Sequence, residues 1–585
     1  MRPLLLVLLS ASVVWSAAPP ERISPERQRV MKEAERLNQL VVALNSEGKL
    51  PEATRAAVQE LQIREALYPT SQFPTGHRDL ADCLNNLAIL YYVQADYAKA
   101  EPLCHRALVM YEKVYPPLRY PQGHPDLALS LNCLAELYKK KAEYGKAEPL
   151  LRRALEMREK LYPASQYPSG HPHLARSLND LAFLYQAQAE YGKAEPLYRQ
   201  TLEMYEKLYP ASQYLSGHPD LVISLNDLAG LYLAQGEYRK AEPLFRRSLE
   251  MVEKLYPGSR YPTGHPSLAT CLTNLGELYR AQAEYGKSES LLRRALEINE
   301  KHYPISRYPE GYPNLATSLN NLGLLYNSQA EYGKAEPLFR RALEMYKKLY
   351  PSSRYPAGHP HLANSLNNLA MLYHDQGEYK KAEPLLRWAL EMVEKLYPAS
   401  RYPSGHPDLA RSLTNLARLY KDQAEYGQAE HLYRRALEMF EKQYPASRYP
   451  SASTPGHQPG ATWQCCIMIS RVPQGGAAAN AGDGREAYPA SRYPSGHPNL
   501  TVSLNNLAVQ YQDQAEYGQA EPLYRRALEM NEKLYPTMWY LTGHPELARS
   551  LNNLGALYKS KAEYSKAEPL LRRALEMYTA SSAVC

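Results

Sequence analysis

Residues 170–185 read GHPHLARSLNDLAFLY, and residues 189–198 read AEYGKAEPLY. Near-copies of these two phrases recur with a period of 47 residues, and a histidine opens nearly every copy. A period in this range is typical of a solenoid, in which each unit buries its apolar face against the next unit. The sequence therefore predicts one extended fold with a continuous core. The histidines on the period are His77, His124, His171, His218, His265, His359, His406, His497 and His544.

Each copy predicts two helices and a linker. Pro172 suits the first position of a helix because a missing N–H costs little there, so we expect His171 to cap that helix. The second helix is expected to end at Tyr209, and residues 211–217 to run extended to the next histidine. Apolar residues at helical spacing give the expected core faces. They are Leu174, Leu178, Leu181, Ala182 and Tyr185 on the first helix, and Tyr191, Ala194, Tyr198, Thr201, Leu202 and Tyr205 on the second.

This pattern resembles the tetratricopeptide repeat, and more closely the lengthened version found in kinesin light chains. The phrase SLNNLAMLY at 365–373 and the recurrent AEPLxRRAL are typical of that type. The resemblance covers about residues 30–452 and 493–580. It implies an all-α, right-handed superhelical solenoid of antiparallel helix pairs. The unit is longer than the family's usual one through its Tyr-Pro-x-Ser-Arg-Tyr-Pro linker, and the sequence has no heptad coiled coil for a motor chain.

The chain divides into five expected parts. Residues 1–18 form a signal peptide, and residues 19–76 form a degenerate repeat that caps the N-terminal end. Residues 77–452 hold eight repeats, residues 453–492 a disrupted one, and residues 493–585 two more. The last repeat stops soon after its second helix, with no polar capping helix, so we expect an incomplete C-terminus.

The N-terminus predicts export. Arg2 is followed by an apolar run from Leu4 to Val14 and by small residues at 16–18. The run is too short to span a bilayer, so we expect no stable membrane insertion. The expected location is the periplasm or the extracellular space. If the apolar N-terminus is not a functional signal, the location is the cytoplasm.

The disrupted repeat is interpreted as a reading-frame error. Residues 453–487 are rich in Gly and Ala, yet the codons that 463–470 allow spell the phrase of 369–376 when shifted by one base. A sequencing error, a gene-model error or a recent mutation would explain this. Cys465 and Cys466 lie in this segment and are not expected to form a metal or redox site.

Composition and spacing argue against catalysis and nucleic-acid binding. The 68 basic and 61 acidic residues are evenly mixed, with a net charge of +7. The seven cysteines occupy unmatched repeat positions, which indicates drift and not a disulfide framework. Packed helices lie about 8–10 Å apart, whereas zinc needs ligands about 2 Å from one point. The periodic histidines therefore cannot share a metal ion, and we expect no enzyme activity, no cofactor and no metal site.

An asparagine row is the candidate binding site. A carboxamide offers both a donor and an acceptor, which match the backbone of an extended peptide. The resemblance implies the same, because the equivalent asparagines of related repeat proteins contact bound peptide. The alternative is that these side chains bond the neighbouring helix. The row consists of Asn86, Asn274, Asn321, Asn368, Asn415, Asn506 and Asn553, with Cys133, Asp180 and Asp227 in the same position elsewhere.

The exposed positions beside the row are expected to set partner selectivity. They differ from repeat to repeat: Glu136, Phe183, Gly230, Glu277, Leu324, Met371 and Arg418. The predicted function is a non-enzymatic scaffold that binds a peptide or a protein surface in a concave groove. One alternative is the sensor arm of a larger protein that has lost a C-terminal effector such as a caspase-like protease domain. A motor-cargo adaptor is a weaker alternative.

Overall fold

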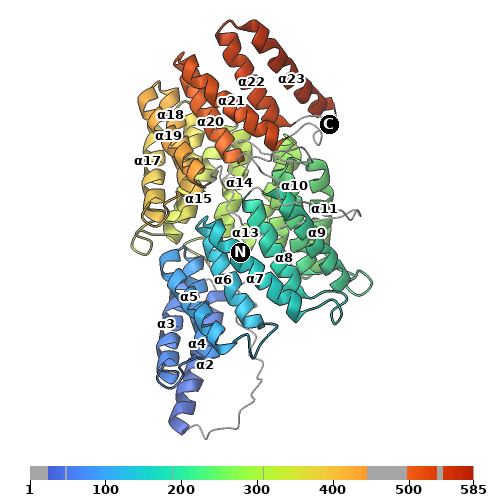
Figure 1. Ribbon diagram of the computed structural model, residues 1–585, viewed down its shortest axis with the longest axis vertical. Coiled ribbons are helices and arrows are strands. Elements are labelled where there is room, and N and C mark those ends of the chain that lie inside the picture. Colours follow the sequence, from blue (N-terminus) through green and yellow to red (C-terminus); the bar gives the residue numbers. More distant parts are fainter. Residues whose placement is uncertain are drawn as a thin grey trace. The chain divides into compact units, whose positions relative to one another are not determined.

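Helices make up the whole of the described secondary structure. The computed structural model describes residues 24–46, 49–188, 190–306, 308–443, 497–535 and 544–583 (Figure 1). Within those ranges there are 22 helices, α2 to α23, and no strand. They pack as consecutive pairs, which confirms the predicted all-α solenoid of helix pairs. The expected signal peptide and the disrupted repeat lie outside the described residues.

The two helices of a pair differ in length and in their first residue. Most first helices begin at the proline that follows the periodic histidine, and most second helices begin at a tyrosine. The first helices are α2 (Pro25–Ser46), α4 (Arg78–Val93), α6 (Pro125–Lys140), α8 (Pro172–Ala187), α10 (Pro219–Ala234), α12 (Pro266–Ala281), α14 (Pro313–Ser328), α16 (Pro360–Asp375), α18 (Pro407–Asp422), α20 (Pro498–Asp513) and α22 (Pro545–Ser560). The second helices are α3 (Leu50–Leu67), α5 (Tyr97–Val114), α7 (Tyr144–Leu161), α9 (Tyr191–Leu208), α11 (Tyr238–Leu255), α13 (Tyr285–His302), α15 (Tyr332–Leu349), α17 (Tyr379–Leu396), α19 (Tyr426–Gln443), α21 (Tyr517–Leu534) and α23 (Tyr564–Ala583).

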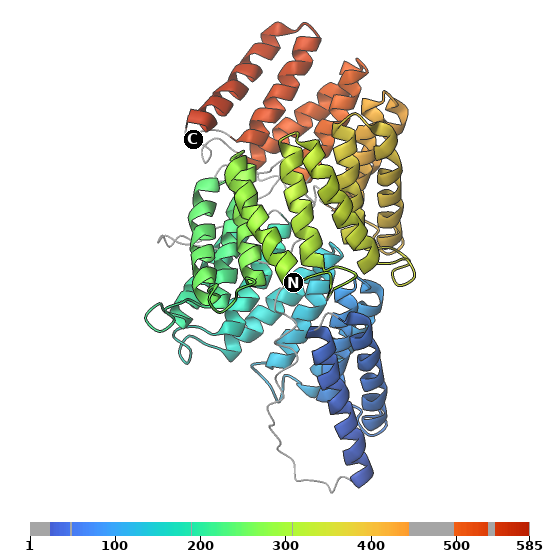
Figure 2. The ribbon, with the colours of Figure 1, turned by 180° about the vertical axis from the view of Figure 1, so that it is seen from behind.

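The chain forms two compact units, Met1–Leu184 and Tyr185–Cys585. In the second unit, each second helix packs against the first helix of the next pair, as α11 does against α12. Both views show the pairs from α14 to α19 stacked in order (Figure 1 and Figure 2). Successive first helices also approach each other along their backbones, for example α12 and α14, whereas successive second helices of the described chain are joined by long side chains. The first helices therefore lie closer together and line the inner side of the stack.

The predicted core faces are largely confirmed. All six predicted residues of α9 are buried, and Tyr198 and Leu202 are fully enclosed. On α8 the predicted residues are buried except Leu174, which is partly exposed. The helix period in the sequence therefore locates the core correctly, because each helix buries one continuous apolar stripe.

The periodic histidines cap the first helices, as predicted. In unit 2, the Nδ1 atom of His218 accepts the backbone N–H of Asp220 at 3.2 Å. The His218 ring also stacks on Tyr209, the residue that ends the preceding helix, with ring centroids 3.5 Å apart. One histidine thus satisfies a helix terminus and packs the linker.

The prediction of an extended linker is wrong. The N–H groups of Gln213 and Tyr214 both donate to the Pro210 carbonyl at 2.9 Å, and the N–H of Gly217 donates to the Tyr214 carbonyl at 2.7 Å. These bonds fold the linker into two successive turns. The Tyr214 ring packs edge-on against His218, with centroids 5.7 Å apart. We call the Tyr209–Tyr214–His218 arrangement and its equivalents the aromatic clasp, and its ring contacts are the reason that the linker folds back.

The solenoid continues across the undescribed segment between α19 and α20. Tyr511 on α20 donates to Glu430 on α19 at 2.7 Å, and Lys421 pairs with Asp513 at 2.9 Å. The same tyrosine-to-glutamate bond joins ordinary neighbours, as between Tyr373 and Glu336 at 2.8 Å. The described helices on the two sides of the break therefore pack as ordinary neighbours. The helix α20 occupies the place of the next first helix.

Deleting residues 444–487 is therefore expected to leave the fold intact. The deletion joins Gln443 to residues 488–496, whose sequence YPASRYPSG is identical to the linker at 397–405. A shorter closing loop should raise the free energy of unfolding by about 1.5 kcal/mol, because closure entropy grows with the logarithm of loop length. Urea denaturation followed by circular dichroism measures this change.

A longer deletion is the matched control. Removing 444–496 also removes the linker, so α19 and α20 cannot stack and the variant should be less stable than the parent. Lower stability in both deletion variants would show that the removed segment contributes to the array.

Candidate functional site

The accessible part of a first helix is one narrow stripe. After the first turn of α14, only Thr317, Asn321 and Ser328 reach the surface, while the residues between them are buried. Their spacings of four and seven place them on one side of the helix. Because the first helices line the inner side of the stack, this stripe forms the inner surface of the repeat. We call it the inner stripe.

Six of the seven row asparagines lie at the surface of this stripe. Asn368 is the exception, since its residue is only 3% exposed. The partly exposed members are Asn86, Asn274, Asn321, Asn415, Asn506 and Asn553. Within the second unit, a ligand on the inner stripe could therefore reach five of these side chains, from Asn274 to Asn553, without any rearrangement of the helices.

Three row members bond the preceding repeat. The Nδ2 atom of Asn274 donates to Asn226 at 3.3 Å, and that of Asn415 donates to Asn367 at 3.3 Å. The third bond, from Asn553 to Asn505, measures 3.4 Å. The alternative that the row bonds a neighbouring helix thus describes these residues. Each bond uses one N–H group, and a carboxamide has a second N–H and an oxygen.

A second asparagine row, one residue earlier in each repeat, supports the first. Asn226 is 5% exposed, and its Nδ2 lies 2.8 Å from the Val222 carbonyl and 2.5 Å from Ser248 Oγ. In the sequence each of these residues directly precedes a member of the first row, so the two rows look like a single polar position. Two repeats have threonine in this position, Thr273 and Thr414, and this difference from the first row is the signal that could have distinguished the second row. The buried members of the second row are Asn85, Asn132, Asn179, Asn226, Asn320, Asn367 and Asn505.

Where threonine replaces the second-row asparagine, the inter-repeat bond is lost. The Thr273 hydroxyl donates to the Ala269 carbonyl at 2.8 Å, within its own helix. Asn321, the row member that follows it, has no hydrogen bond to Thr273 in the described structure. An asparagine at this position is therefore needed for the bond but does not ensure it, since the Oδ1 atom of Asn320 accepts no hydrogen bond within the described residues.

The prediction of seven exposed selectivity positions is wrong for three of them. Glu277, Leu324 and Met371 are 8%, 3% and 2% exposed. The close approach of successive first helices from α12 to α18 covers this position. Glu277 is instead paired with Arg280 at 2.9 Å. Glu136, Phe183, Gly230 and Arg418 do remain partly exposed.

A polar ladder joins the C-terminal ends of the first helices. Each rung connects the fifteenth residue of one first helix to the sixteenth residue of the next. Asn327 donates to Asp375 at 3.1 Å, and His374 Nε2 lies 2.8 Å from Asp422. Burial lowers the pKa of His374, but its hydrogen bonds with Asp375 and Asp422 outweigh burial and hold that pKa above the usual value. The ladder fixes the relative position of neighbouring repeats at one edge of the inner stripe.

The capping histidines carry no metal-site geometry. Burial lowers the pKa of His497 to about 3, and that of His173, two residues after a cap, to about 4. A neutral ring keeps Nδ1 free to accept the capping bond, so the shift agrees with the structural role. Within the described ranges, no three His, Cys, Asp or Glu side chains are placed to share a metal ion.

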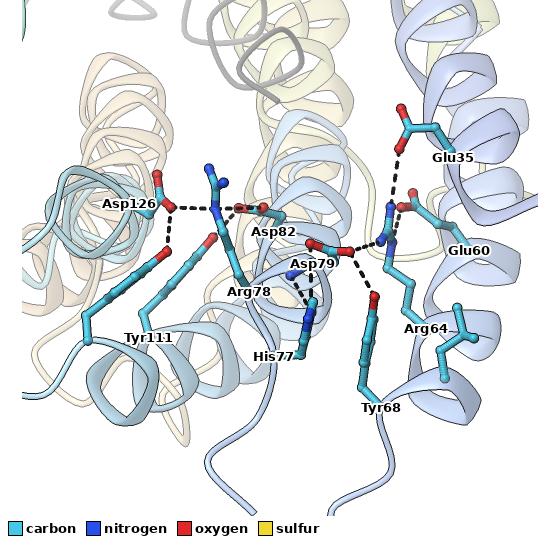
Figure 3. A network of polar contacts seen from close by, with 12 residues as sticks. Glu35, Glu60, Arg64, Tyr68, His77, Arg78, Asp79, Asp82, Tyr111 and Asp126 are labelled. Atoms are coloured by element: carbon cyan, nitrogen blue, oxygen red, sulfur yellow. Dashed lines mark hydrogen bonds and ion pairs between the residues drawn. The ribbon is translucent and has the colours of Figure 1, made fainter. Parts of the chain in front are cut away.

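The first unit contains a polar network that the sequence did not suggest. Arg64 lies between Glu60 at 2.6 Å, Asp79 at 3.1 Å and Glu35 at 3.8 Å (Figure 3). Tyr68 also donates to Asp79 at 3.0 Å. These contacts tie α2 and α3 to α4, so each carboxylate has a structural partner. The network anchors the degenerate first repeat to the regular array.

A second part of this network involves a buried carboxyl group. Arg78 pairs with Asp126 at 2.7 Å, and Tyr111 donates to Asp82 (Figure 3). Burial raises the pKa of Asp82 to about 6.

Two family models, both described as tetratricopeptide repeat, match most of the chain. One matches residues 174–220, 222–267, 268–305, 315–361, 500–546 and 547–581, and the other matches 79–160, 352–395 and 399–442. The chain belongs to the tetratricopeptide-repeat family.

Solved structures of kinesin-light-chain-like repeat proteins resemble the chain. BtubC (BKLC) of P. vanneervenii is 22% identical, with a TM-score of 0.32, over 51% of this chain and 90% of its own. A kinesin-light-chain-like protein of Podosopora anserina with nearly identical TPR-like repeats is 23% identical, with a TM-score of 0.31, over 39% of this chain and 99% of its own. No curated protein matches the sequence. None of the described helices has the length and apolar character required to cross a bilayer.

Proposed function

We propose that this protein is a non-enzymatic scaffold that holds an extended peptide of a partner protein along the inner stripe. Tetratricopeptide repeats generally mediate protein–protein interactions. The observation that carries the proposal is the placement of six row asparagines at the surface of the first helices, one in each of six repeats. We also propose that the protein is exported, on the basis of the sequence of residues 1–18.

The geometry suits a ligand that is read through its backbone. In the second unit the partly exposed row members lie on α12, α14, α18, α20 and α22, and each carboxamide presents both a donor and an acceptor. A peptide in an extended conformation offers the same pair of groups at regular intervals. The residues beside the row vary between repeats, and Phe183, Gly230 and Arg418 give chemically different surroundings. The row would supply general affinity and these neighbours would supply selectivity.

The inner stripe is tested with a triple substitution in the full-length chain. Asn274→Ala, Asn321→Ala and Asn415→Ala together remove three partly exposed row members. We expect the affinity for a captured partner to fall at least tenfold, because each lost carboxamide contributes about 0.5–1.5 kcal/mol and three together contribute about 1.5 kcal/mol or more. Affinity capture with mass spectrometry identifies the partner, and titration with the purified partner measures the loss.

The matched control changes three exposed carboxylates on second helices. Glu250→Ala, Glu297→Ala and Glu438→Ala leave the inner stripe untouched. This control should bind the partner as the parent does, with both variants equally helical by circular dichroism. An unchanged affinity in the asparagine variant would place the binding surface elsewhere.

A further inference from the structure

A ladder of ion pairs joins successive second helices, and at one rung both members of the pair are replaced. In the ordinary rung, an arginine bonds a glutamate of the preceding second helix. Arg341 on α15 meets Glu300 on α13 at 2.6 Å, and Arg435 on α19 meets Glu394 on α17 at 2.6 Å. Between α15 and α17 both members are replaced, because Trp388 stands in the arginine position and Lys347 in the glutamate position.

The exchanged rung exposes an aromatic ring. Trp388 is 40% exposed, one of few large apolar residues at the surface of the described chain. Lys347 Nζ lies 5.7 Å from the Trp388 ring centroid, a cation–π contact in place of the ion pair. Lys347 is also bonded to Glu344 at 2.7 Å. The two substitutions therefore act together and convert a charged rung into an aromatic one.

Trp388 borders a pocket at the linker between α15 and α16. The pocket has a volume of about 410 Å³, within the usual range for ligand sites. Most of its lining is aromatic, prolyl or aliphatic. The residues that matter for recognition are Trp388, Tyr350, Tyr355, Pro351, Pro356 and Met392.

The aromatic walls of this pocket are held in place. Tyr350 belongs to the aromatic clasp of this linker and stacks on His359 with ring centroids 3.5 Å apart. Tyr355 packs edge-on against Tyr350 at 5.3 Å. Rigid aromatic rings bind a ligand with little loss of side-chain entropy. They favour a partner that is itself rigid and apolar, and proline-rich segments dock on aromatic-lined grooves for that reason.

The charge around the pocket favours an acidic partner. Lys347 and Lys395 line the pocket with one carboxylate, Glu391, which pairs with Lys395 at 2.6 Å. In ordinary rungs these two positions hold a glutamate and an arginine, so with Lys347 and Trp388 this rung is more positive by one charge. An acidic residue next to the prolines would find favourable potential here, whereas a basic residue would be repelled.

We propose that this pocket binds a proline-rich segment of a partner protein that carries an acidic residue beside its prolines. The segment would stack its pyrrolidine rings on Trp388 and Tyr355 and place its carboxylate near Lys347. The site is separate from the inner stripe, since it is built from second helices and a linker. It does not depend on the function proposed for the asparagine row.

The test measures binding of labelled peptides to the full-length chain by fluorescence anisotropy. The probes are three decapeptides with a core of six prolines, flanked by two aspartates, two serines or two lysines on each side. We expect the aspartate peptide to bind at submillimolar concentration. The serine peptide should bind several-fold more weakly, and the lysine peptide more weakly still.

The decisive variant restores the ordinary rung. Trp388→Arg with Lys347→Glu recreates the pair that Arg341 and Glu300 form, so the variant should fold normally. It should lose at least tenfold in affinity for the aspartate peptide, while the triple asparagine variant should keep that affinity. Equal binding of the three peptides, equal binding to parent and restored rung, or no binding at millimolar concentration would each overturn the proposal.

Discussion

Lowering the pH from 7 to 5 is expected to reduce the free energy of unfolding of this protein by about 2 kcal/mol through the capping histidine His497 alone, and His359 shifts it in the same direction. His359 and His497 are 4% and 3% exposed. Burial lowers the pKa of His497 to about 3 and that of His359 well below its usual value. Their rings must therefore remain neutral while the chain is folded, whereas they accept a proton near pH 6.5 when it is unfolded.

The sign follows from proton uptake. Between the unfolded pKa near 6.5 and the lowered folded pKa, the unfolded state binds more protons, so stability falls as the pH falls. Each histidine contributes about 1.4 kcal/mol for each pH unit in that window. The contribution is fully present above pH 6.5 and is lost progressively below it. In the folded state, His497 Nδ1 accepts the backbone N–H of Asn499 at 3.2 Å. Protonation of Nδ1 would make two N–H groups face each other, and this capping bond would be lost.

Other groups oppose this trend. Burial raises the pKa of Glu546 to about 7 and that of Asp82 to about 6, so both carboxyl groups bind protons more readily in the folded state. The pKa of His374 is raised by its hydrogen bonds with Asp375 and Asp422 despite burial, and its contribution is present below pH 6.5 and lost as the pH rises. A comparison of variants is therefore needed to isolate the two caps.

The natural sequence supplies the matched substitution. Tyr312 stands in the position of the histidine in one repeat, makes no capping bond and stacks on Tyr303 with ring centroids 3.8 Å apart. The double variant His359→Tyr with His497→Tyr should lose about 1 kcal/mol per cap at pH 7. Urea denaturation at pH 7 and pH 5 should then show a smaller pH effect in the variant than in the parent. The same pH effect in both proteins would contradict the role assigned to these histidines.

Gly217→Ala is expected to cost about 3 kcal/mol, a large effect for the addition of one methyl group. Gly217 has φ +84°, a conformation that disfavours any side chain by about 1–2 kcal/mol. A Cβ atom at this position would also overlap the Met251 side chain, and overpacking of this kind costs about 1–3 kcal/mol. Ala283 adopts φ +59° in a turn between helices, so positive φ alone is tolerated in this fold. The overlap with Met251 is the decisive term.

Two further variants separate the terms. Gly258→Ala in the following linker adds a methyl group with no atom within 4 Å, and should change the free energy of unfolding by less than about 0.5 kcal/mol. In a Met251→Ala background, the cost of Gly217→Ala should fall to the conformational part, about 1–2 kcal/mol. Chemical denaturation measures the free energy of unfolding of the four variants and of the parent. A cost that stays the same in the Met251→Ala background would exclude the overlap as its cause.

The asparagine row shows where prediction from the sequence reached its limit. The period places an asparagine in each of seven repeats on the same side of the first helix, which the structure confirms for Asn321. The period alone could not show that Asn368 would be buried, nor that Asn274 and Asn415 would each bond a second-row asparagine of the preceding repeat. Those outcomes depend on how closely the neighbouring helices approach, and the sequence of one repeat does not contain that distance.

The sequence by itself determined the helices, their caps and their core faces, because these follow from the spacing of apolar residues and from the residue at each helix start. His171 and Leu202 could be assigned their roles from a single repeat. The tertiary structure decided what involves two repeats at once: the burial of Leu324 and Met371, and the direct stacking of α20 on α19. Trp388 belongs to the same group, since the pocket beside it exists only where one repeat meets the linker of another. Local spacing encodes the elements, whereas contacts between residues 40 or more positions apart depend on the distance and angle between packed helices.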